Sequence, residues 1–331
     1  MPVLPRTGRQ VDLDVARGFA IFLVVVGHIV TRGDQLSGND WFIVVMKKIY
    51  EFHMPFFMVL SGITFALSLP KFGAWREVFA YSFKRIWPLL AVWVVFGLVV
   101  LAGKQMAMSF LNGNHPSDDF LLNAALLFLN PTESAVRFLW FIYVLAIFLL
   151  LVPVLFYLFG RRPGALLLVS VGLCFFNWPV DFALAAAVDY LPFFTLGMIL
   201  SMHRPVWMPM PRGLFWISLI TFTVLLIGSS YFQVPKWLVG SASVFPLLGL
   251  AQRIREKGSV FWSYLGQRSL AIYLFNLPVI GLVKGLMLFV LPWNGMVFFA
   301  YLPLLIIMGA GLPLAIKAAG QKWLPQVAKF I

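Results

Sequence analysis

The chain has 331 residues, of which 61% are hydrophobic and only 11% are charged, and its net charge at pH 7 is +13. A soluble globular protein is nearer half apolar and a quarter charged, so this composition excludes an ordinary soluble domain. The positive charge does not indicate nucleic acid binding, because most Lys and Arg residues fall in short segments between apolar runs, as membrane topology requires.

Apolar runs of about 20 residues recur from end to end, and each is long enough to cross a hydrocarbon core roughly 30 Å thick. The sequence therefore predicts an all-α polytopic membrane protein. The first run lacks a small-residue cleavage site and carries polar residues, so we interpret it as a permanent span and not a signal peptide. With Pro, Gly and charged residues as punctuation, ten spans are predicted near 13–30, 50–69, 79–102, 138–160, 164–180, 183–201, 213–230, 236–251, 269–291 and 295–316.

This threading puts most of the Lys and Arg residues that lie outside the spans on one side of the membrane, which predicts that both termini are cytoplasmic. The run FLLNAALLFL at 120–129 has only ten residues, about 15 Å as a helix, so we expect a re-entrant or interfacial element there. No internal repeat or linker is visible, and one membrane domain over residues 1–331 accounts for the chain.

The first span contains LDVARGFAIFLVVVGH, in which Arg17 and His28 are eleven residues apart. At 100° per residue both lie on nearly the same helix face, and Asp14 is placed three residues before Arg17, where the two side chains can pair. Such residues are costly in lipid and are expected to face the bundle interior or a water-filled cavity. His28 is a candidate general base. The alternatives are snorkelling of Asp14 and Arg17 to the interface and a simple interhelical hydrogen bond for His28.

A second polar group opens the next span, in YEFHMPFFMVLSG. His53 precedes Pro55, which favours a helix start or a kink. Glu51 is two residues from His53, too close to share a helix face, but it can meet His53 if the segment is not yet helical. We therefore expect His53 to complete a catalytic site with His28, and Glu51 to orient one of the two histidines.

The third span opens with SFKRIWPLLAVW, where Lys84 and Arg85 are expected at the cytoplasmic end. Positive charge at that end is predicted by topology alone. The functional interpretation is that Lys84 and Arg85 join Arg17 in binding the phosphates of a nucleotide-containing donor. No CxxC, HExxH, Walker A or GxGxxG motif is visible, so no metal and no tightly bound cofactor are predicted.

Six segments in this order resemble the acyltransferase family 3 membrane proteins: LDVARGFAIFLVVVGH, FHMPFFMVLSG, FKRIWP, FLWFIYVL, YLPFFTLGM and LGQRSLAIYLFNLP. The FHMPFF form is most similar to the fucose 4-O-acetylase-related branch. The resemblance implies that Arg17, His28 and Arg85 are functional. The sequence departs from the family pattern at two positions. Ser82 stands where the first arginine of an R-x-x-R is expected. Asn276 stands where relatives often have histidine, and its amide is expected to have only a supporting, hydrogen-bonding role.

The resemblance also implies an O-acyltransferase, with acetyl-CoA or another acyl-CoA as cytoplasmic donor and a hydroxyl of a cell-envelope glycan or related molecule as acceptor. It implies a multi-pass protein of the bacterial inner membrane without the SGNH-type domain fused to some relatives. Two other classes remain open: a secondary transporter or exporter of a glycan or lipid-linked substrate, and a non-catalytic membrane partner. The acceptor, the acyl chain, the oligomeric state and whether His28 is a base or an acyl carrier do not follow from the sequence.

Overall fold

A computed structural model describes residues 8–30, 38–110, 120–202 and 209–323, and within these ranges every regular element is a helix. The described residues form two compact units. One unit lies within Met1–Leu67 and Leu200–Pro325, and the other lies within Ser68–Ile199. We call them the first and the second unit and describe each by itself.

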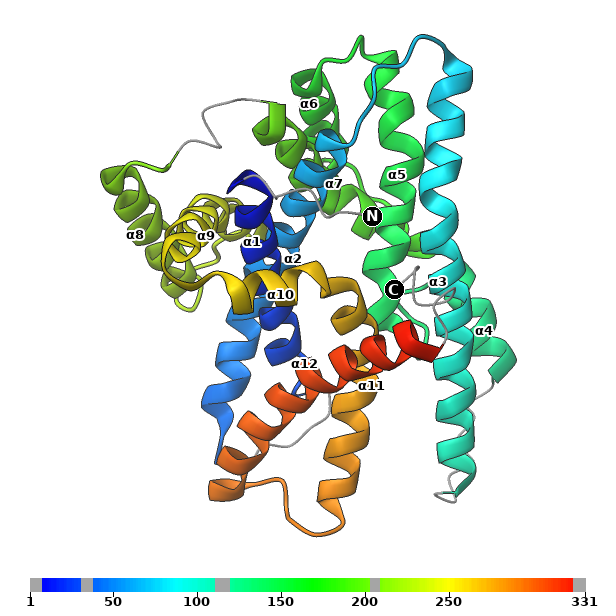
Figure 1. The fold of residues 1–331 in the computed structure, drawn as a ribbon, viewed down its shortest axis with the longest axis vertical. Coiled ribbons are helices and arrows are strands. Elements are labelled where there is room, and N and C mark those ends of the chain that lie inside the picture. The colour runs from blue at the N-terminus through cyan, green and yellow to red at the C-terminus, as the bar shows by residue number, and fades with distance from the viewer. Residues whose placement is uncertain (1–7, 31–37, 111–119, 203–208, 324–331) are drawn as a thin grey trace. The chain divides into compact units, whose positions relative to one another are not determined.

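The first unit is built around α1 (Gly8–Gly27), which contacts five other helices of this unit and lies beside α2 and α10 in Figure 1. Much of α1 is packed inside this unit, since the side chains of Val15, Ala16, Ala20, Ile21 and Val25 are fully buried. The helices around it are α2 (Asp40–Leu67), α9 (Lys236–Gly258), α10 (Val260–Gln267), α11 (Ser269–Leu288) and α12 (Phe298–Trp323), and α8 (Arg212–Gly228) packs on α9.

The closest helix crossing in the first unit joins α1 to α10. A Cβ atom added at Gly266 would lie 1.8 Å from the backbone oxygen of Asp14, and one added at Gly18 would lie 2.1 Å from that of Trp262. Small residues let helix backbones approach in this way in membrane proteins. The ring of Trp262 then packs edge-on against Phe19, with ring centroids 4.7 Å apart.

The second unit contains α3 (Trp75–Phe110), α4 (Phe120–Leu129), α5 (Trp140–Leu158), α6 (Pro163–Leu173) and most of α7 (Leu184–Met202). Short 3-10 helices at Arg137–Leu139 and Asp181–Ala183 lead into α5 and α7. Its core includes an aromatic pair between α5 and α7, Phe148 and Phe194, with ring centroids 5.1 Å apart.

In the described part of the chain, seven helices are long and apolar enough to cross a membrane: α2, α3, α5, α7, α9, α11 and α12. Each of these seven has a proline in its interior. Interior proline breaks soluble helices, but transmembrane helices tolerate it because neighbouring groups satisfy the freed carbonyls. The other three predicted spans overlap α1, α6 and α8, which are not among the helices both long and apolar enough to cross a membrane. The count of ten spans therefore remains a prediction.

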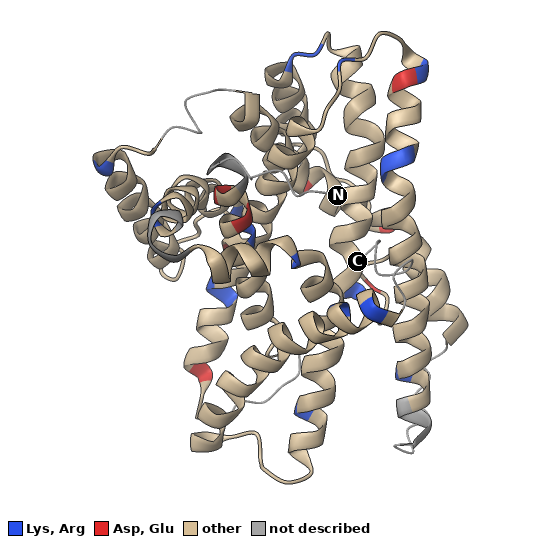
Figure 2. Cartoon of the chain, in the orientation of Figure 1, with Lys and Arg blue, Asp and Glu red and all other residues tan. Residues whose placement is uncertain are grey.

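The structure differs from the predicted elements in several places. The second helix begins at Asp40 and not near residue 50. It continues through Pro55, which therefore marks neither its start nor its end. The third begins at Trp75, so Lys84 and Arg85 lie about three turns inside it and not at its opening. The segment before the ninth predicted span, expected to be a loop, forms the helix α10. Figure 2 shows how sparse charged residues are along the helices.

Candidate functional site

His28 directly follows the last residue of α1, and its backbone amide still donates to the carbonyls of Val24 and Val25. Its imidazole Nδ1 lies 2.6 Å from Oδ1 of Asn276, which is on α11. The His28 residue is half-buried, whereas Asn276 is fully buried. The imidazole therefore points toward a helix of the protein and not toward lipid.

The amide of Asn276 is fixed by its own helix. Its Nδ2 donates to the carbonyl oxygens of Ile272 and Tyr273, each at 2.7 Å. Pro278 follows two residues later and lacks the amide hydrogen that would continue the helix ladder. From the sequence, Asn276 was expected only to form a hydrogen bond; its partner lies 248 positions away in the chain.

His53 lies on α2 and is almost fully buried, with 2% of its surface exposed. Its Nδ1 is 2.7 Å from the carbonyl oxygen of Ile49, one helical turn earlier. Tyr50 connects His53 to the end of α1: its ring packs edge-on against the imidazole, and its hydroxyl donates to the carbonyl oxygen of Gly27 at 2.9 Å. His53 thus supports the backbone that precedes His28. The sequence carried no signal for the partner of the Tyr50 hydroxyl.

The predicted pairing of Asp14 with Arg17 is confirmed. Nη1 of Arg17 lies 3.6 Å from Oδ1 of Asp14, and the side chains are 26% and 10% exposed, respectively. Nη2 of Arg17 donates to the hydroxyl of Thr64 on α2, and that hydroxyl donates to the carbonyl oxygen of Leu60 at 2.8 Å. The guanidinium is therefore held by two helices and still reaches the surface. Thr64 was missed because its partner is 47 residues away.

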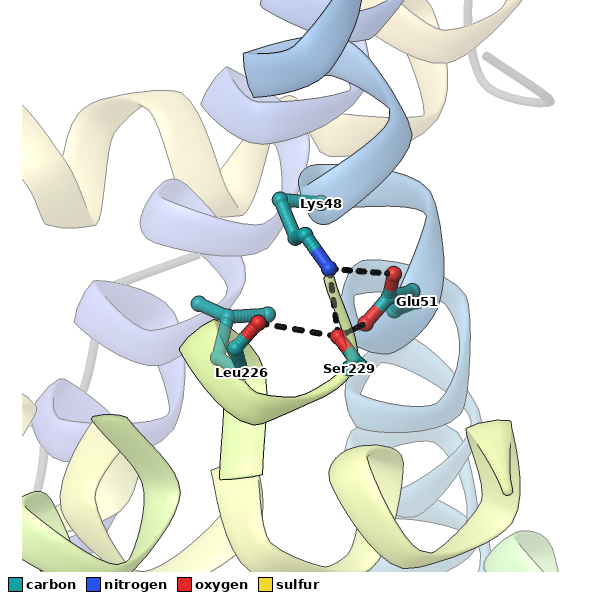
Figure 3. A network of polar contacts seen from close by, with 4 residues as sticks. All are labelled: Lys48, Glu51, Leu226 and Ser229. Carbon is teal, nitrogen blue, oxygen red and sulfur yellow. Dashed lines mark hydrogen bonds and ion pairs between the residues drawn. The ribbon is translucent and has the colours of Figure 1, made fainter. Parts of the chain in front are cut away.

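Glu51 does not meet His53 in this structure. Both residues lie within α2, where a separation of two residues places them on opposite faces. Figure 3 shows that the Glu51 carboxylate is instead bound by Lys48, whose Nζ is 3.0 Å from Oε1, and by the hydroxyl of Ser229, which is 2.6 Å from Oε2. Lys48 also donates to Ser229, which follows α8. The expectation that Glu51 contacts His53 is wrong because α2 is already helical there, and this cluster ties α2 to the end of α8.

Lys84 and Arg85 belong to the second unit, whereas Arg17 belongs to the first. Lys84 is exposed, and Arg85 is half-buried with its guanidinium 5.2 Å from the centre of the Tyr81 ring. Ser82, where the family motif has arginine, is fully buried. A joint donor site of Arg17, Lys84 and Arg85 therefore stays a prediction. Among the described residues, no group of three or more His, Cys, Asp or Glu side chains is placed to hold a metal ion.

Residues 10–317 match the family described as "Acyltransferase domain". The chain is 25% identical over 237 residues to the nodulation protein NolL of Mesorhizobium japonicum, covering 69% of this chain and 57% of that protein. It is 28% identical over 200 residues to the nodulation protein NolL of Sinorhizobium fredii, covering 58% and 49%. The chain thus spans about half the length of these curated relatives. No solved structure matches it significantly. Since the family match extends over nearly all of a chain with several membrane-crossing helices, the protein is a multi-pass integral membrane protein that belongs to the acyltransferase family 3.

Proposed function

We propose that this protein is an integral membrane O-acetyltransferase, which moves the acetyl group of cytoplasmic acetyl-CoA to a hydroxyl of a cell-envelope glycan or related acceptor. Family membership supports acyl transfer. One observation carries the assignment to a site: the imidazole of His28, a half-buried residue that follows the helix carrying Arg17, is hydrogen-bonded to Asn276.

His28 is the group best suited to remove a proton from the acceptor hydroxyl. Neutral imidazole accepts protons near pH 7, and a positioned base contributes about 10²–10⁴-fold to the rate of such reactions. His53 is less suited, because only 2% of its surface is exposed and an acceptor cannot reach it directly. We assign His53 and Tyr50 to supporting the end of α1.

One base is sufficient for the transfer, because the proton that it takes from the acceptor is returned to the leaving group. The acceptor oxygen attacks the thioester carbonyl carbon while its proton moves to His28. The carbon–sulfur bond then breaks, and CoA leaves as a thiolate that takes the proton back from the imidazolium. The products are the acetyl ester and CoA in its thiol form, and His28 returns to its neutral state. A second route, in which His28 carries the acetyl group covalently, uses the same residue.

Arg17 is proposed to bind the phosphates of acetyl-CoA. Its side chain is 26% exposed, and the contacts with Asp14 and Thr64 hold the guanidinium in one orientation, which suits recognition of phosphate oxygens. Arg85 and Lys84 are proposed as further phosphate-binding residues. We also propose that the protein has ten spans and cytoplasmic termini and lies in the bacterial inner membrane. In this proposal α4 is a re-entrant or interfacial element of one membrane domain.

The FHMPFF segment supports placing the chain near the fucose 4-O-acetylase-related branch of the family. The names of the two relatives connect them with nodulation. The first observation favours a cell-envelope saccharide as acceptor, and we include that class in the proposal.

The test uses purified full-length protein in lipid nanodiscs with labelled acetyl-CoA and a panel of envelope glycans. Acceptor-dependent release of CoA is expected. His28→Ala is expected to lower kcat at least about 10²-fold, and Arg17→Ala to raise KM for acetyl-CoA about tenfold or more, as for loss of a charge-assisted hydrogen bond. Ser243→Ala is the control, because Ser243 is buried in α9 and bonds the carbonyl of Gly240 in its own helix.

Full activity of His28→Ala would overturn the assignment of the base. Absence of acceptor-dependent CoA release over the whole panel, together with movement of a glycan across proteoliposomes, would favour the transporter class instead.

A further inference from the structure

The orientation of the Asn276 amide determines which atom of Asn276 faces His28. Both hydrogens of Nδ2 are directed at carbonyl oxygens, those of Ile272 and Tyr273. If the amide were flipped, its oxygen would lie 2.7 Å from two other oxygens with no hydrogen between them. The nitrogen therefore faces the helix carbonyls, and Oδ1 faces His28.

An amide oxygen only accepts hydrogen bonds. The contact of 2.6 Å between His28 Nδ1 and Asn276 Oδ1 therefore requires the hydrogen to be on Nδ1. In the neutral ring the other nitrogen, Nε2, then has no hydrogen and keeps its lone pair. This is the tautomer that a base needs if the acceptor approaches from the Nε2 side.

We propose that Asn276 is a positioning residue that holds His28 as the Nδ1–H tautomer and presents Nε2 to the acceptor hydroxyl. This inference rests on the proposed function and deepens it. Asn276 suits the role because it is fully buried and anchored twice to its own helix, so its oxygen has little freedom to move. The imidazole is thereby held at the ring, while Tyr50 holds the backbone through the carbonyl of Gly27.

The same argument applies to His53 and separates it from His28. Its Nδ1 faces the carbonyl oxygen of Ile49, so His53 is also an Nδ1–H tautomer. Its acceptor nitrogen is enclosed, since the residue is 2% exposed, whereas the His28 residue is half-buried. Of these two residues, His28 is the more exposed, which favours it over His53 as the base.

The first measurement does not depend on activity. Full-length protein with ¹³C,¹⁵N-labelled histidine is examined by solid-state NMR in liposomes at alkaline pH, where the ring is neutral. The four histidines of the chain are separated by comparison with His28→Gln, and the two ring nitrogens are distinguished by their bonds to Cγ or Cδ2. The hydrogen of His28 is expected on Nδ1. A hydrogen on Nε2 of the neutral ring overturns the proposal.

The second measurement separates positioning from folding. Asn276→Leu keeps the volume and removes the acceptor oxygen, and kcat is expected to fall about 10²-fold with KM for acetyl-CoA changed less than about twofold. Asn276→Asp in its protonated form keeps an acceptor oxygen for Nδ1 and donates one hydrogen to a helix carbonyl, and it is expected to recover at least about tenfold of that loss. Asn123→Leu is the matched control: Asn123 is a buried asparagine of the second unit that bonds the backbone amide of Ala135.

A wild-type kcat in Asn276→Leu, or equal losses in the Leu and Asp variants, overturns the positioning role. Failure of the proposed function looks different, because then the wild-type protein releases no CoA with any acceptor, and failure of the base assignment leaves His28→Ala active; the tautomer is read from the NMR spectrum in either case. If Asn276→Leu does not fold, the Asp variant and the wild-type NMR spectrum still decide the outcome.

Discussion

Replacing Gly266 by alanine is expected to force α10 away from α1. The added Cβ would lie 1.8 Å from the carbonyl oxygen of Asp14 and 2.9 Å from the backbone nitrogen of Gly18. Ordinary van der Waals contact begins near 3.4 Å, so the two helices must separate by at least about 1.6 Å. Both clashing groups are backbone atoms, which cannot rotate away as a side chain can. Overpacking of this kind costs about 1–3 kcal/mol.

The expected loss is therefore about 2 kcal/mol, which lowers the apparent melting temperature in detergent by about 4–8 °C. Gly18→Ala clashes at the same crossing, with its Cβ 2.1 Å from the oxygen of Trp262. The double variant is expected to lose less than the two single losses together, because the helices are already apart. The shift also displaces Arg17, which stands on α1 next to Gly18, so KM for acetyl-CoA is expected to rise.

Gly281→Ala is the matched control. This glycine lies inside α11, and an added Cβ there meets no atom within 4 Å. Alanine is favoured over glycine in a helix interior by about 0.5–1 kcal/mol, so the control is expected to melt at or above the wild-type temperature. If Gly266→Ala and Gly281→Ala had the same melting temperature and both had the wild-type KM for acetyl-CoA, the close crossing would not exist in the protein.

Three further substitutions test other contacts of the first unit. Tyr50→Phe removes the hydroxyl bond to the end of α1 and keeps the ring on its histidine neighbour; kcat is expected to fall about 2–10-fold, the equivalent of one hydrogen bond. An unchanged kcat in steady-state assays would mean that this bond does not support the base. Ser229→Ala breaks the link between α8 and Glu51, and thermal unfolding is expected to show a loss of about 1 kcal/mol without a change in KM; wild-type stability would argue against the link. Lys284→Met removes a cation 4.0 Å from the centre of the Trp293 ring, with an expected loss of about 0.5–2 kcal/mol in the same assay; a stabilised variant would contradict this assignment.

Short-range features of the site were predictable from the sequence. The Asp14–Arg17 pair was predicted because residues three apart on a helix are neighbours whatever the helix packs against. The expected contact between Glu51 and His53 was wrong, and the reason is equally local. Pro55 suggested a helix start, but α2 begins at Asp40 and continues through the proline, which turns Glu51 toward Lys48 and Ser229.

Other features were missed because they depend on contacts between distant segments. The helix α10 has only eight residues and lies in a stretch that resembles a cytoplasmic loop, and its place against α1 depends on Gly18 and Gly266 approaching backbone to backbone. Thr64 and Tyr50 are unremarkable in a sequence of apolar helices. Their partners, Arg17 and the carbonyl of Gly27, lie on a different helix.

The sequence by itself determined the class of this protein and most of its helices, because bilayer thickness sets the length of an apolar run and the backbone must satisfy its hydrogen bonds within each span. It also marked Arg17 and His28, since polar groups are costly in lipid. Only the tertiary structure decided that His28 meets Asn276 on α11 and that Arg17 meets Thr64 on α2. Those outcomes depend on how helices far apart in the chain pack together, and no local pattern of residues encodes that packing.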